Sequence, residues 1–466
     1  MGNRRECGER TSLALRACSC ENAGMKKWFL IWVSILPLFF PLYLVRFSVG
    51  GVPTTLLEVL VALTLMVGVI FFVRPRSLKE AFFNLKKQGL KSMFWPILLF
   101  VGAAIFSTFI VPKTTVAIDG TIVGSQLVAF GVLKGWILMP IFYFAMIRFV
   151  PWTGKDKKRM LVALALSGFG LSLWAIYQMV TGSFTTWDGR ASGPFESANY
   201  LALYLGPILV MCAGHIVQIF CSTKKVLFWL ILFFVMAVAF WGTQSYAAFI
   251  AFFVGTAFYG LFSSTISRKF KIVACLGAFV VVTGFFVTQM NTAKFQSFLD
   301  FDARTSSSVR IEVYRVAWGL IQSHPVAGIG LGQFQVQYAL NAPTILGHAP
   351  YEWVMLHPHN LGLAFWLNTG IFGVLAMAWL LMVVFFGRRK GERAEASVAC
   401  KSGMSVDVAV ALGECTRSSD TAVWKRALRL VGLAMMITIL THGLFDVPFF
   451  KNDLAYLWWL VVGLSV

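Results

Sequence analysis

The chain has 466 residues, of which 58% are hydrophobic and 13% are charged, and its 40 lysines and arginines against 20 acidic residues give a net charge of +20. A soluble domain carries roughly 45–50% apolar residues, so this composition excludes a soluble globular protein and indicates a membrane protein. No soluble basic patch is available for nucleic acid, so we predict no nucleic-acid partner.

Apolar segments recur along the whole chain. A run of about 18 or more mostly apolar residues can cross the roughly 30 Å hydrocarbon core as a helix. We therefore predict an all-α integral membrane protein with about twelve transmembrane helices, at residues 28–45, 55–73, 93–111, 126–147, 160–180, 199–220, 226–241, 245–262, 271–288, 359–386, 427–446 and 451–466. The last segment is short and ends at the chain terminus, so it either reaches the surface with little tilt or inserts only in part.

The spans divide the chain into successive parts. We predict an N-terminal extension at 1–27, spans one to nine at 28–288, a long outer loop with helical segments at 289–358, span ten at 359–386, a flexible loop at 387–426, and spans eleven and twelve at 427–466. The 387–426 loop is assigned no chemistry, because it is rich in small residues, mixed in charge and poor in aromatic residues.

Lysine and arginine positions orient the chain, because basic loops resist translocation. With both termini in the cytoplasm, most basic residues fall on the inner side. The outer segments carry only Arg46, Lys113, Arg190, Lys294, Arg304, Arg310, Arg315 and Lys451.

The outer segment 181–198 leads into the sixth span. Arg190 is its only basic residue, and Ser197 or Asn199 is placed to cap the helix that follows. Because this helix begins on the outer side, its N-terminus presents free N–H groups and partial positive charge there.

The long outer loop contains the stretch SSSVRIEVYRVAWGLIQSHP, residues 306–325. We predict a helix that a serine caps and Pro325 ends, with a buried stripe at residues 309, 313, 316 and 320. Arg310 and Arg315 lie about 140° apart around such a helix, so one of them is structural. The following HPVAGIGLGQF is a tight turn rather than a phosphate loop, because no strand precedes it and no GK[ST] follows.

The tenth span begins with His357-Pro358-His359-Asn360. His357 is predicted to cap this helix, with Pro358 at its first position, where a missing N–H costs nothing. Two helix N-termini then meet the outer surface beside Arg190 and Arg310. That environment suits a diphosphate.

Four motifs in this order resemble the O-antigen ligase and polymerase superfamily of bacterial membrane glycosyltransferases: GRASGPFESANYLALYL, SSVRIEVYRVAWGLIQSHPVAGIGLGQF, HPHNLGLAFWLNTGIFG and HGLFDVPFFKNDLAYLWWLVVGL. The third is similar to the ligase pattern of His-Asn, nine residues and Gly-x-x-Gly, here His359, Asn360, Gly370 and Gly373. The likeness covers about residues 185–466. One departure is Asn368, where many members carry an acidic residue.

The resemblance implies a GT-C-like fold in a bacterial inner membrane, with the long loop in the periplasm. It implies a glycosyltransferase. We predict that it needs no cofactor and no metal, because no convincing set of metal ligands faces outward. The donor would be a glycan on undecaprenyl diphosphate, the acceptor most simply the lipid A core or another glycan, and membrane lipid would surround both.

We predict the site residues from this chemistry. A diphosphate leaves as a stable anion, so fixed cations help more than an acid does, whereas the acceptor hydroxyl needs a base such as a neutral histidine. The catalytic candidates are His359 and His357. The donor-binding candidates are Arg190, Arg310, Lys134 and Asn360, and the supporting candidates are His442, Asp446 and Arg315.

Several alternatives stay open. His357 has helix capping as its other role, and Lys134 either reaches the diphosphate or pairs with Glu58 within the spans. Asp300-Phe301-Asp302 resembles a metal-binding Asp-x-Asp, but a solvated loop is the simpler interpretation. A His-x-His metal site at 357–359 is disfavoured, because no cysteine and few acidic residues are near.

Two classes of function remain. The first is the transferase, as an O-antigen ligase or, in close variants, an O-antigen or exopolysaccharide polymerase or a protein O-oligosaccharyltransferase. The second is a small-solute transporter, since twelve spans are common among transporters. Transporters often show internal repeats and binding residues at the membrane midplane; the sequence shows no such repeat, and its informative polar residues lie on one face.

Overall fold

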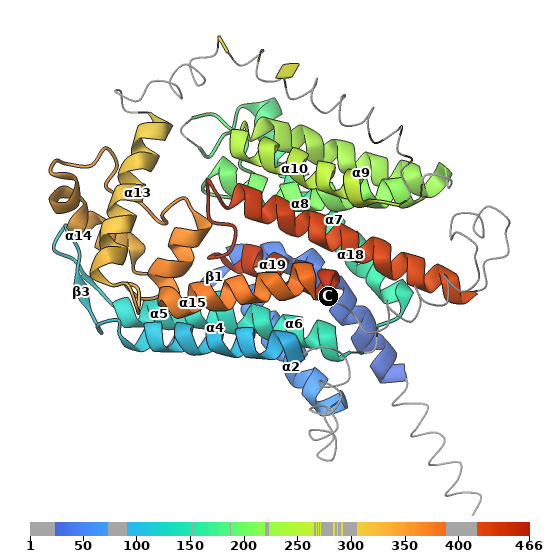
Figure 1. Cartoon of the computed structure of the whole chain (residues 1–466), viewed down its shortest axis with the longest axis horizontal. Helices are drawn as coiled ribbons and strands as arrows, with labels where there is room; N and C mark the ends of the chain where they lie inside the picture. The colour runs from blue at the N-terminus through green and yellow to red at the C-terminus, as the bar shows by residue number, and fades with distance from the viewer. Residues whose placement is uncertain are drawn as a thin grey trace, which may run out of the picture.

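The computed structural model describes residues 24–72, 91–150, 152–186, 188–219, 223–264, 305–387 and 417–466, with scattered residues between 267 and 291. These residues form a helical bundle with two short β-hairpins (Figure 1). The all-α prediction is confirmed. Residues 1–23 and 388–416, most of the predicted ninth span, and the Asp300 and Asp302 motif lie outside the described residues.

The N-terminal third supplies one side of the bundle. A helix begins at residue 24 and tightens into the 3-10 helix η1 (Leu36–Leu44), where Pro41 lacks the N–H that an α-helix needs. A hairpin with Arg46 opposite Thr55 then leads into α2. The elements that follow η1 are β1 (Arg46–Val49), β2 (Val52–Thr55), α2 (Leu56–Phe72), α4 (Lys91–Phe109), β3 (Thr115–Val116), β4 (Ile122–Val123), α5 (Ser125–Val132), the π-helix η2 (Leu133–Leu138) and α6 (Met139–Phe149).

Four long apolar helices form the opposite side. The first begins at a capping box in which Thr153 and Asp156 satisfy each other's backbone N–H groups. It ends at Gly182, which adopts the left-handed conformation (φ +71°). These helices are α7 (Gly154–Thr181), α8 (Ala198–Ile219), α9 (Thr223–Gly242) and α10 (Tyr246–Phe262).

Two helices of the segment 305–358, which the sequence predicts to lie on the outer side, pack on each other beside the bundle. They are α13 (Ser306–Ser323) and α14 (Phe334–Leu346). The helix predicted at 306–325 is confirmed, although Thr305 caps it, in a capping box with Ser308. Its buried face carries Val313, Val316 and Leu320, which join a hydrophobic cluster of their own with Tyr338 and Leu367.

The last three helices close the bundle. They are α15 (Leu361–Phe386), α18 (Arg417–His442) and α19 (Asn452–Ser465). α15 packs along α4, and α18 packs against α8, α10 and α19. Almost every residue of α19 is buried, so this short segment lies enclosed among other helices. Whether it spans the membrane fully stays a prediction.

The glycine-rich segment after α13 is a turn packed on a kink in α15. Gly370 interrupts that helix with φ +66°, and a Cβ there would approach the Val326 carbonyl oxygen to 2.0 Å. Gly328 meets the opposite side of the kink, where a Cβ would lie 2.3 Å from the Leu367 carbonyl oxygen. Asn368, the departure noted above, accepts a hydrogen bond from the Gly332 N–H at 2.8 Å, a contact that needs an oxygen but no charge.

Seven helices of the described residues are long and apolar enough to cross a membrane, and the helices at Leu56–Ile70 and Tyr246–Phe262 are apolar but shorter. The protein is a multi-pass membrane protein; the count of twelve spans stays a prediction. Two predicted boundaries are wrong. α18 begins at Arg417, so 417–426 is helical rather than a flexible loop, and it ends at His442 rather than residue 446.

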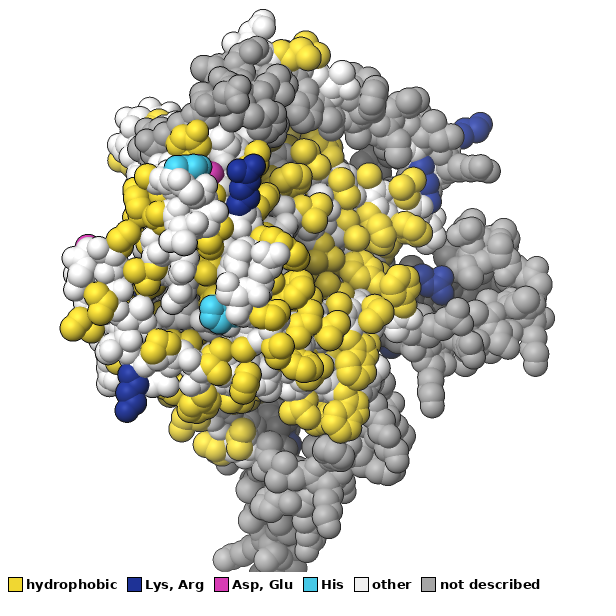
Figure 2. Space-filling model, turned by 60° about the vertical axis from the view of Figure 1, so that its left-hand side comes forward, with side chains coloured by type: hydrophobic (Ala, Val, Ile, Leu, Met, Phe, Trp, Pro, Cys, Tyr) yellow, Lys and Arg dark blue, Asp and Glu magenta, His cyan; other side chains and the backbone are white. Residues whose placement is uncertain are grey.

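Exposed apolar side chains mark the lipid-facing surface. Figure 2 shows hydrophobic side chains spread over much of one face. On α9 they recur every three or four residues, which is one face of a helix: Leu227, Phe228, Ile231, Phe234, Val238 and Trp241.

Candidate functional site

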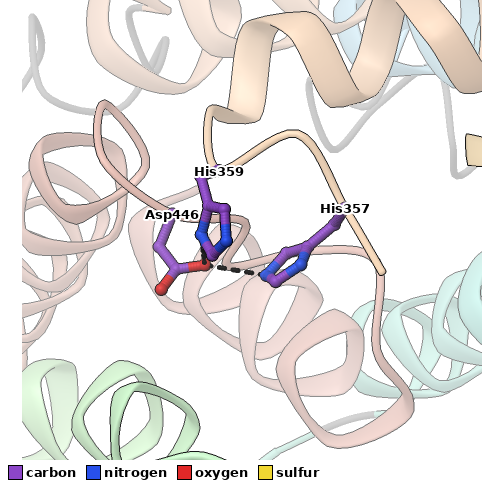
Figure 3. Close-up of side chains that lie close together, drawn as sticks. All are labelled: His357, His359 and Asp446. Carbon is purple, nitrogen blue, oxygen red and sulfur yellow. Dashed lines mark hydrogen bonds and ion pairs between the residues drawn. The ribbon is translucent and has the colours of Figure 1, made fainter. Parts of the chain in front are cut away.

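Two histidines before α15 converge on one carboxylate after α18. The His357 Nε2 atom lies 2.9 Å from Asp446 Oδ1, and the His359 Nδ1 atom lies 3.6 Å from the same oxygen. The imidazoles come from one loop and the carboxylate from another, and both rings point toward it (Figure 3). Asp446 is 2% exposed, so the pair of histidines covers a buried negative charge.

The chain path at the start of α15 creates this convergence. Asn360 caps the helix by accepting from the Leu363 N–H at 3.1 Å, and its amide donates to the Leu444 carbonyl at 3.1 Å. The Leu361 N–H donates to the Gly443 carbonyl at 2.7 Å. These bonds tie the loop before α15 to the turn after α18, and so bring Asp446 to the histidines.

The predicted cap of this helix is wrong. His357 was expected to cap it with Pro358 at the first helical position, but the helix begins at Leu361 and Asn360 is its cap. The reason is that the Asn360 side chain reaches the free N–H groups of the first turn, while both imidazoles turn toward Asp446. The Asn360 side chain therefore joins the start of α15 to the turn after α18, and its part in donor binding stays a prediction.

His359 has an unusual backbone conformation. Its φ is +48°, in the left-handed region that residues other than glycine rarely adopt. The hydroxyl of Tyr314 on α13 donates to the His359 carbonyl at 3.0 Å, and the Asn360 cap fixes the next residue. Such a conformation costs about 1–2 kcal/mol, and strained residues of this kind cluster at functional sites.

The ionisation of the cluster favours a neutral base beside a charged carboxylate. Burial lowers the pKa of His359 below its ordinary 6.5, the charges of His357 and Arg310 lower it further, and Asp446 only partly offsets them. Burial opposes ionisation of Asp446, but the hydrogen bond from His357 and the nearby imidazole of His359 hold its pKa well below 3.8. With Nδ1–H toward Asp446, the His359 Nε2 atom is left to accept a proton.

Arg310 faces this cluster from α13, and Arg315 does not. The positive charge of Arg310 acts on His359, His442 and Tyr314. Its Nε atom is buried and makes no hydrogen bond to any described residue. Arg315 is exposed on the other side of the helix, as a five-residue separation predicts. Arg310 thus keeps a free donor beside the histidines.

The Arg190 guanidinium has more hydrogen-bond partners than that of Arg310 among the described residues. It pairs with Asp188 through Nε, and its Nη1 donates at 3.4 Å to both Asn199 Oδ1 and the Thr243 carbonyl. Asn199 lies in the first turn of α8. Its N–H donates at 3.2 Å to the hydroxyl of Ser197, which comes just before the helix. Arg190 therefore sits at the N-terminus of α8, as the sequence predicts.

Lys134 has a partner away from the histidines. Its Nζ lies 3.0 Å from Glu58 Oε2 and donates to the Thr54 hydroxyl at 2.7 Å and the Pro53 carbonyl at 2.9 Å. Asn452 completes this buried network by donating to Glu58 Oε1 at 2.7 Å. Of the two roles open for Lys134, the structure shows the pairing with Glu58, and we do not carry it forward as a donor-binding residue.

The side chain of His442, one of the supporting candidates, makes no hydrogen bond to Asp446 among the described residues. It is 2% exposed, and its Nε2 has no hydrogen-bond partner among the described residues. Its backbone carbonyl instead accepts from the Asp446 N–H at 3.1 Å. The Asp446 Oδ1 atom instead accepts from His357 Nε2 and from the Val447 N–H, both at 2.9 Å.

Sequence reasoning missed an aromatic and cationic layer beneath the histidines. The Tyr200 ring lies 5.8 Å from the His357 ring. The Lys451 Nζ atom lies 3.3 Å from the Tyr200 ring centre and 4.8 Å from that of Phe195. Phe195, Tyr200 and Lys451 fall within the resembling motifs, but hydropathy and spacing carry no sign that these residues approach His357. Tyr314 was missed for the same reason.

The histidine cluster has donors that a metal ion could use. One ligand atom from each of His357, His359 and Asp446 lies within 4.8 Å of the others, and imidazole and carboxylate are common zinc ligands. Few acidic residues lie near these histidines in the sequence, which disfavours a metal there, but the fold brings Asp446 to them. Metal independence is therefore a prediction to test by chelation.

The comparison with known families agrees with the resemblance. Residues 231–378 match the family model described as O-antigen ligase, which confirms the resemblance to that superfamily. The matched segment includes Arg310, Tyr314, His357 and His359, whereas Arg190 and Asp446 lie outside it. No curated protein matches the chain.

Proposed function

We propose that this protein is a glycosyltransferase of the bacterial inner membrane that transfers a glycan from undecaprenyl diphosphate to the lipid A core on the periplasmic side. The observation that supports it most is the cluster of His357, His359 and Asp446 beside Arg310. Arg310 and both histidines fall within the segment that matches the O-antigen ligase family.

The proposed reaction is a displacement at the anomeric carbon of the donor glycan. The acceptor hydroxyl oxygen forms a bond to that carbon while the bond from carbon to phosphate oxygen breaks. The electron pair leaves with undecaprenyl diphosphate, and the hydroxyl proton moves to His359 Nε2. Asp446 stabilises the imidazolium that results, since a carboxylate 3.6 Å from Nδ1 favours the charged ring.

The arginines act on the leaving group. Negative charge grows on the diphosphate as the bond breaks, and fixed cations aimed at it lower the barrier. The buried Arg310 Nε has no acceptor among the described residues, so it can donate to a phosphate oxygen. Arg190 already binds Asp188 and Asn199, so we assign it the supporting role of holding the donor at the N-terminus of α8.

Close variants of the function use the same site. An O-antigen or exopolysaccharide polymerase would accept a second lipid-linked glycan, and a protein O-oligosaccharyltransferase would accept a serine or threonine hydroxyl. Each needs the same base and cations, so these residues do not distinguish them. We favour the ligase because the His-Asn spacing follows the ligase pattern and one long outer loop precedes the last spans.

A transporter is the alternative of another class. Its binding groups would lie at the membrane midplane on broken helices. The Lys134 and Glu58 network lies within the spans, but its charges already satisfy each other. The candidate site lies instead at the start of α15 and the end of α18, where the headgroups of a lipid-linked donor and a lipid A acceptor can meet.

Reconstituted protein tests the proposal. Vesicles containing undecaprenyl-diphosphate glycan and lipid A core should yield glycan-bearing lipid A and free undecaprenyl diphosphate. A product that carries two joined repeat units without lipid A would identify a polymerase, and glycan on a peptide acceptor would identify a protein glycosyltransferase. Accumulation of a labelled solute with no glycan transfer would overturn the enzyme class.

A further inference from the structure

A buried lysine lies behind the histidine pair, where the turn after α18 leads into α19. Lys451 is 8% exposed, and its ammonium faces three aromatic rings. The Nζ atom lies 3.3 Å from the ring centre of Tyr200, 4.8 Å from that of Phe195 and 5.3 Å from that of Tyr43. A cation over the face of an aromatic ring is attracted by the negative charge of that face, more strongly when water is excluded. The closest of these contacts is the one with Tyr200.

The Tyr200 ring joins this lysine to the candidate site. It lies 5.8 Å from the His357 ring, with the two planes tilted by 30°. His357 in turn directs its Nε2 atom to Asp446 Oδ1 at 2.9 Å. A ring held against the imidazole limits its rotation, so the place of Tyr200 decides whether Nε2 reaches the carboxylate. A continuous chain of contacts therefore runs from the ammonium to Asp446.

The backbone next to Lys451 is anchored on its other side. Asn452 donates to Glu58 Oε1 at 2.7 Å and accepts from the Trp136 indole N–H at 2.8 Å. Trp136 belongs to the π-helix η2, a form of helix that is frequent at functional sites. These bonds fix the start of α19, so Tyr200 packs against a cation whose own position is set from below.

We propose that Lys451 is a positioning residue of the transfer site. Its ammonium holds the Tyr200 ring against the His357 imidazole, which keeps His357 hydrogen-bonded to Asp446. The carboxylate then stays oriented toward His359, whose charged ring it stabilises during transfer. The effect on turnover rests on the proposed function, whereas the effect on the His357 ring does not.

Nuclear magnetic resonance of the histidines tests the positioning without any transfer. The full chain carries isotope-labelled histidine, and the His357 signal is identified by its disappearance in His357→Gln. Lys451→Met keeps a long side chain and removes the charge, so we expect it to shift the His357 signal. The control is Lys158→Met, because the Lys158 Nζ atom also lies over a ring, that of Trp424 at 5.0 Å, at the opposite end of α18. An unmoved His357 signal in Lys451→Met, or an equal shift in the control, would overturn the proposal.

Transfer kinetics show whether the positioning matters for turnover. Lys451→Met should lower kcat about tenfold, as for other residues that orient a functional histidine, and should leave the donor dissociation constant within twofold. Lys158→Met should change neither. In a Tyr200→Leu background Lys451→Met should cause no further loss, because residues that act through one another are not additive. Weaker donor binding with full additivity would assign the ammonium to the donor and overturn the proposal.

A charge-keeping variant separates positioning from folding. Lys451→Arg retains a cation that stacks on aromatic rings, so we expect it to restore the His357 signal and most of kcat, with thermal unfolding followed in every variant. A loss of kcat that follows only the unfolding temperature, with no rescue by arginine, would show a structural role and contradict the proposal. A shifted His357 signal in a protein that transfers no glycan would refute the proposed function and support the positioning.

Discussion

The change Asp446→Asn tests the histidine cluster most finely, because it removes a charge and keeps the shape. The amide oxygen of asparagine can still accept from His357, whose Nε2 lies 2.9 Å from the carboxylate. The negative charge 3.6 Å from His359 Nδ1 disappears. What is lost is therefore the stabilisation of the imidazolium that forms as the acceptor proton is taken.

The size of the effect follows from the geometry. Two unit charges about 4 Å apart attract by roughly 4 kcal/mol at the effective dielectric of a protein surface, which is an upper bound because water and the variant amide replace part of it. The 3.6 Å separation is also longer than a hydrogen bond. We therefore expect turnover to fall by about 10- to 100-fold, as for other residues that orient a functional histidine, which corresponds to roughly 1.4–2.7 kcal/mol.

The pH dependence of kcat/KM shows in which direction Asp446 shifts the pKa of His359. Activity requires neutral His359, so it falls as the pH drops through the lowered pKa of that imidazole, below pH 6.5. Asp446 raises this pKa, so its loss should move the acid limb to lower pH while the plateau falls. An acid limb that stays in place or moves upward, or a variant with normal turnover, would refute this account of Asp446.

Three further predictions concern the residues around the cluster. Arg310→Ala should weaken donor binding and turnover more than Arg315→Ala, because only Arg310 faces the histidines; a larger loss for Arg315→Ala in the transfer assay would contradict this. Tyr314→Phe removes the hydroxyl that donates to the His359 carbonyl, and should lower kcat several-fold, since a net hydrogen bond contributes about 1 kcal/mol, with little change in donor KM; unchanged kcat would show that the bond is dispensable. Transfer should persist in a chelator; loss that a divalent ion restores would assign a metal to His357, His359 and Asp446.

Hydropathy predicted the class of the fold but not the path of the backbone. Long apolar runs are sufficient to identify membrane-spanning helices. They carry no signal for the β1–β2 and β3–β4 hairpins, which are short and outside the spans. The start of α18 at Arg417 was missed because charged and small residues there resemble a linker.

The site was predicted in part, because motifs name residues but not their partners. The helix at 306–323 and the opposite directions of Arg310 and Arg315 follow from helical spacing alone. The approach of Asp446 to His359 depends on backbone bonds between Leu361 and Gly443, which join segments far apart in sequence. The left-handed conformation of His359 and the Lys451 contact with Tyr200 are likewise products of tertiary packing.

The central claim is that His359 takes the acceptor proton while other residues hold the donor. His359→Asn is the sharpest change, because asparagine tolerates a positive φ such as the +48° found here and cannot act as the base. In a purified assay with a polyprenyl-diphosphate glycan, we expect kcat to fall by about 10²- to 10⁴-fold while the donor dissociation constant stays within a few-fold of the original value. Near-normal transfer by this variant would contradict the claim.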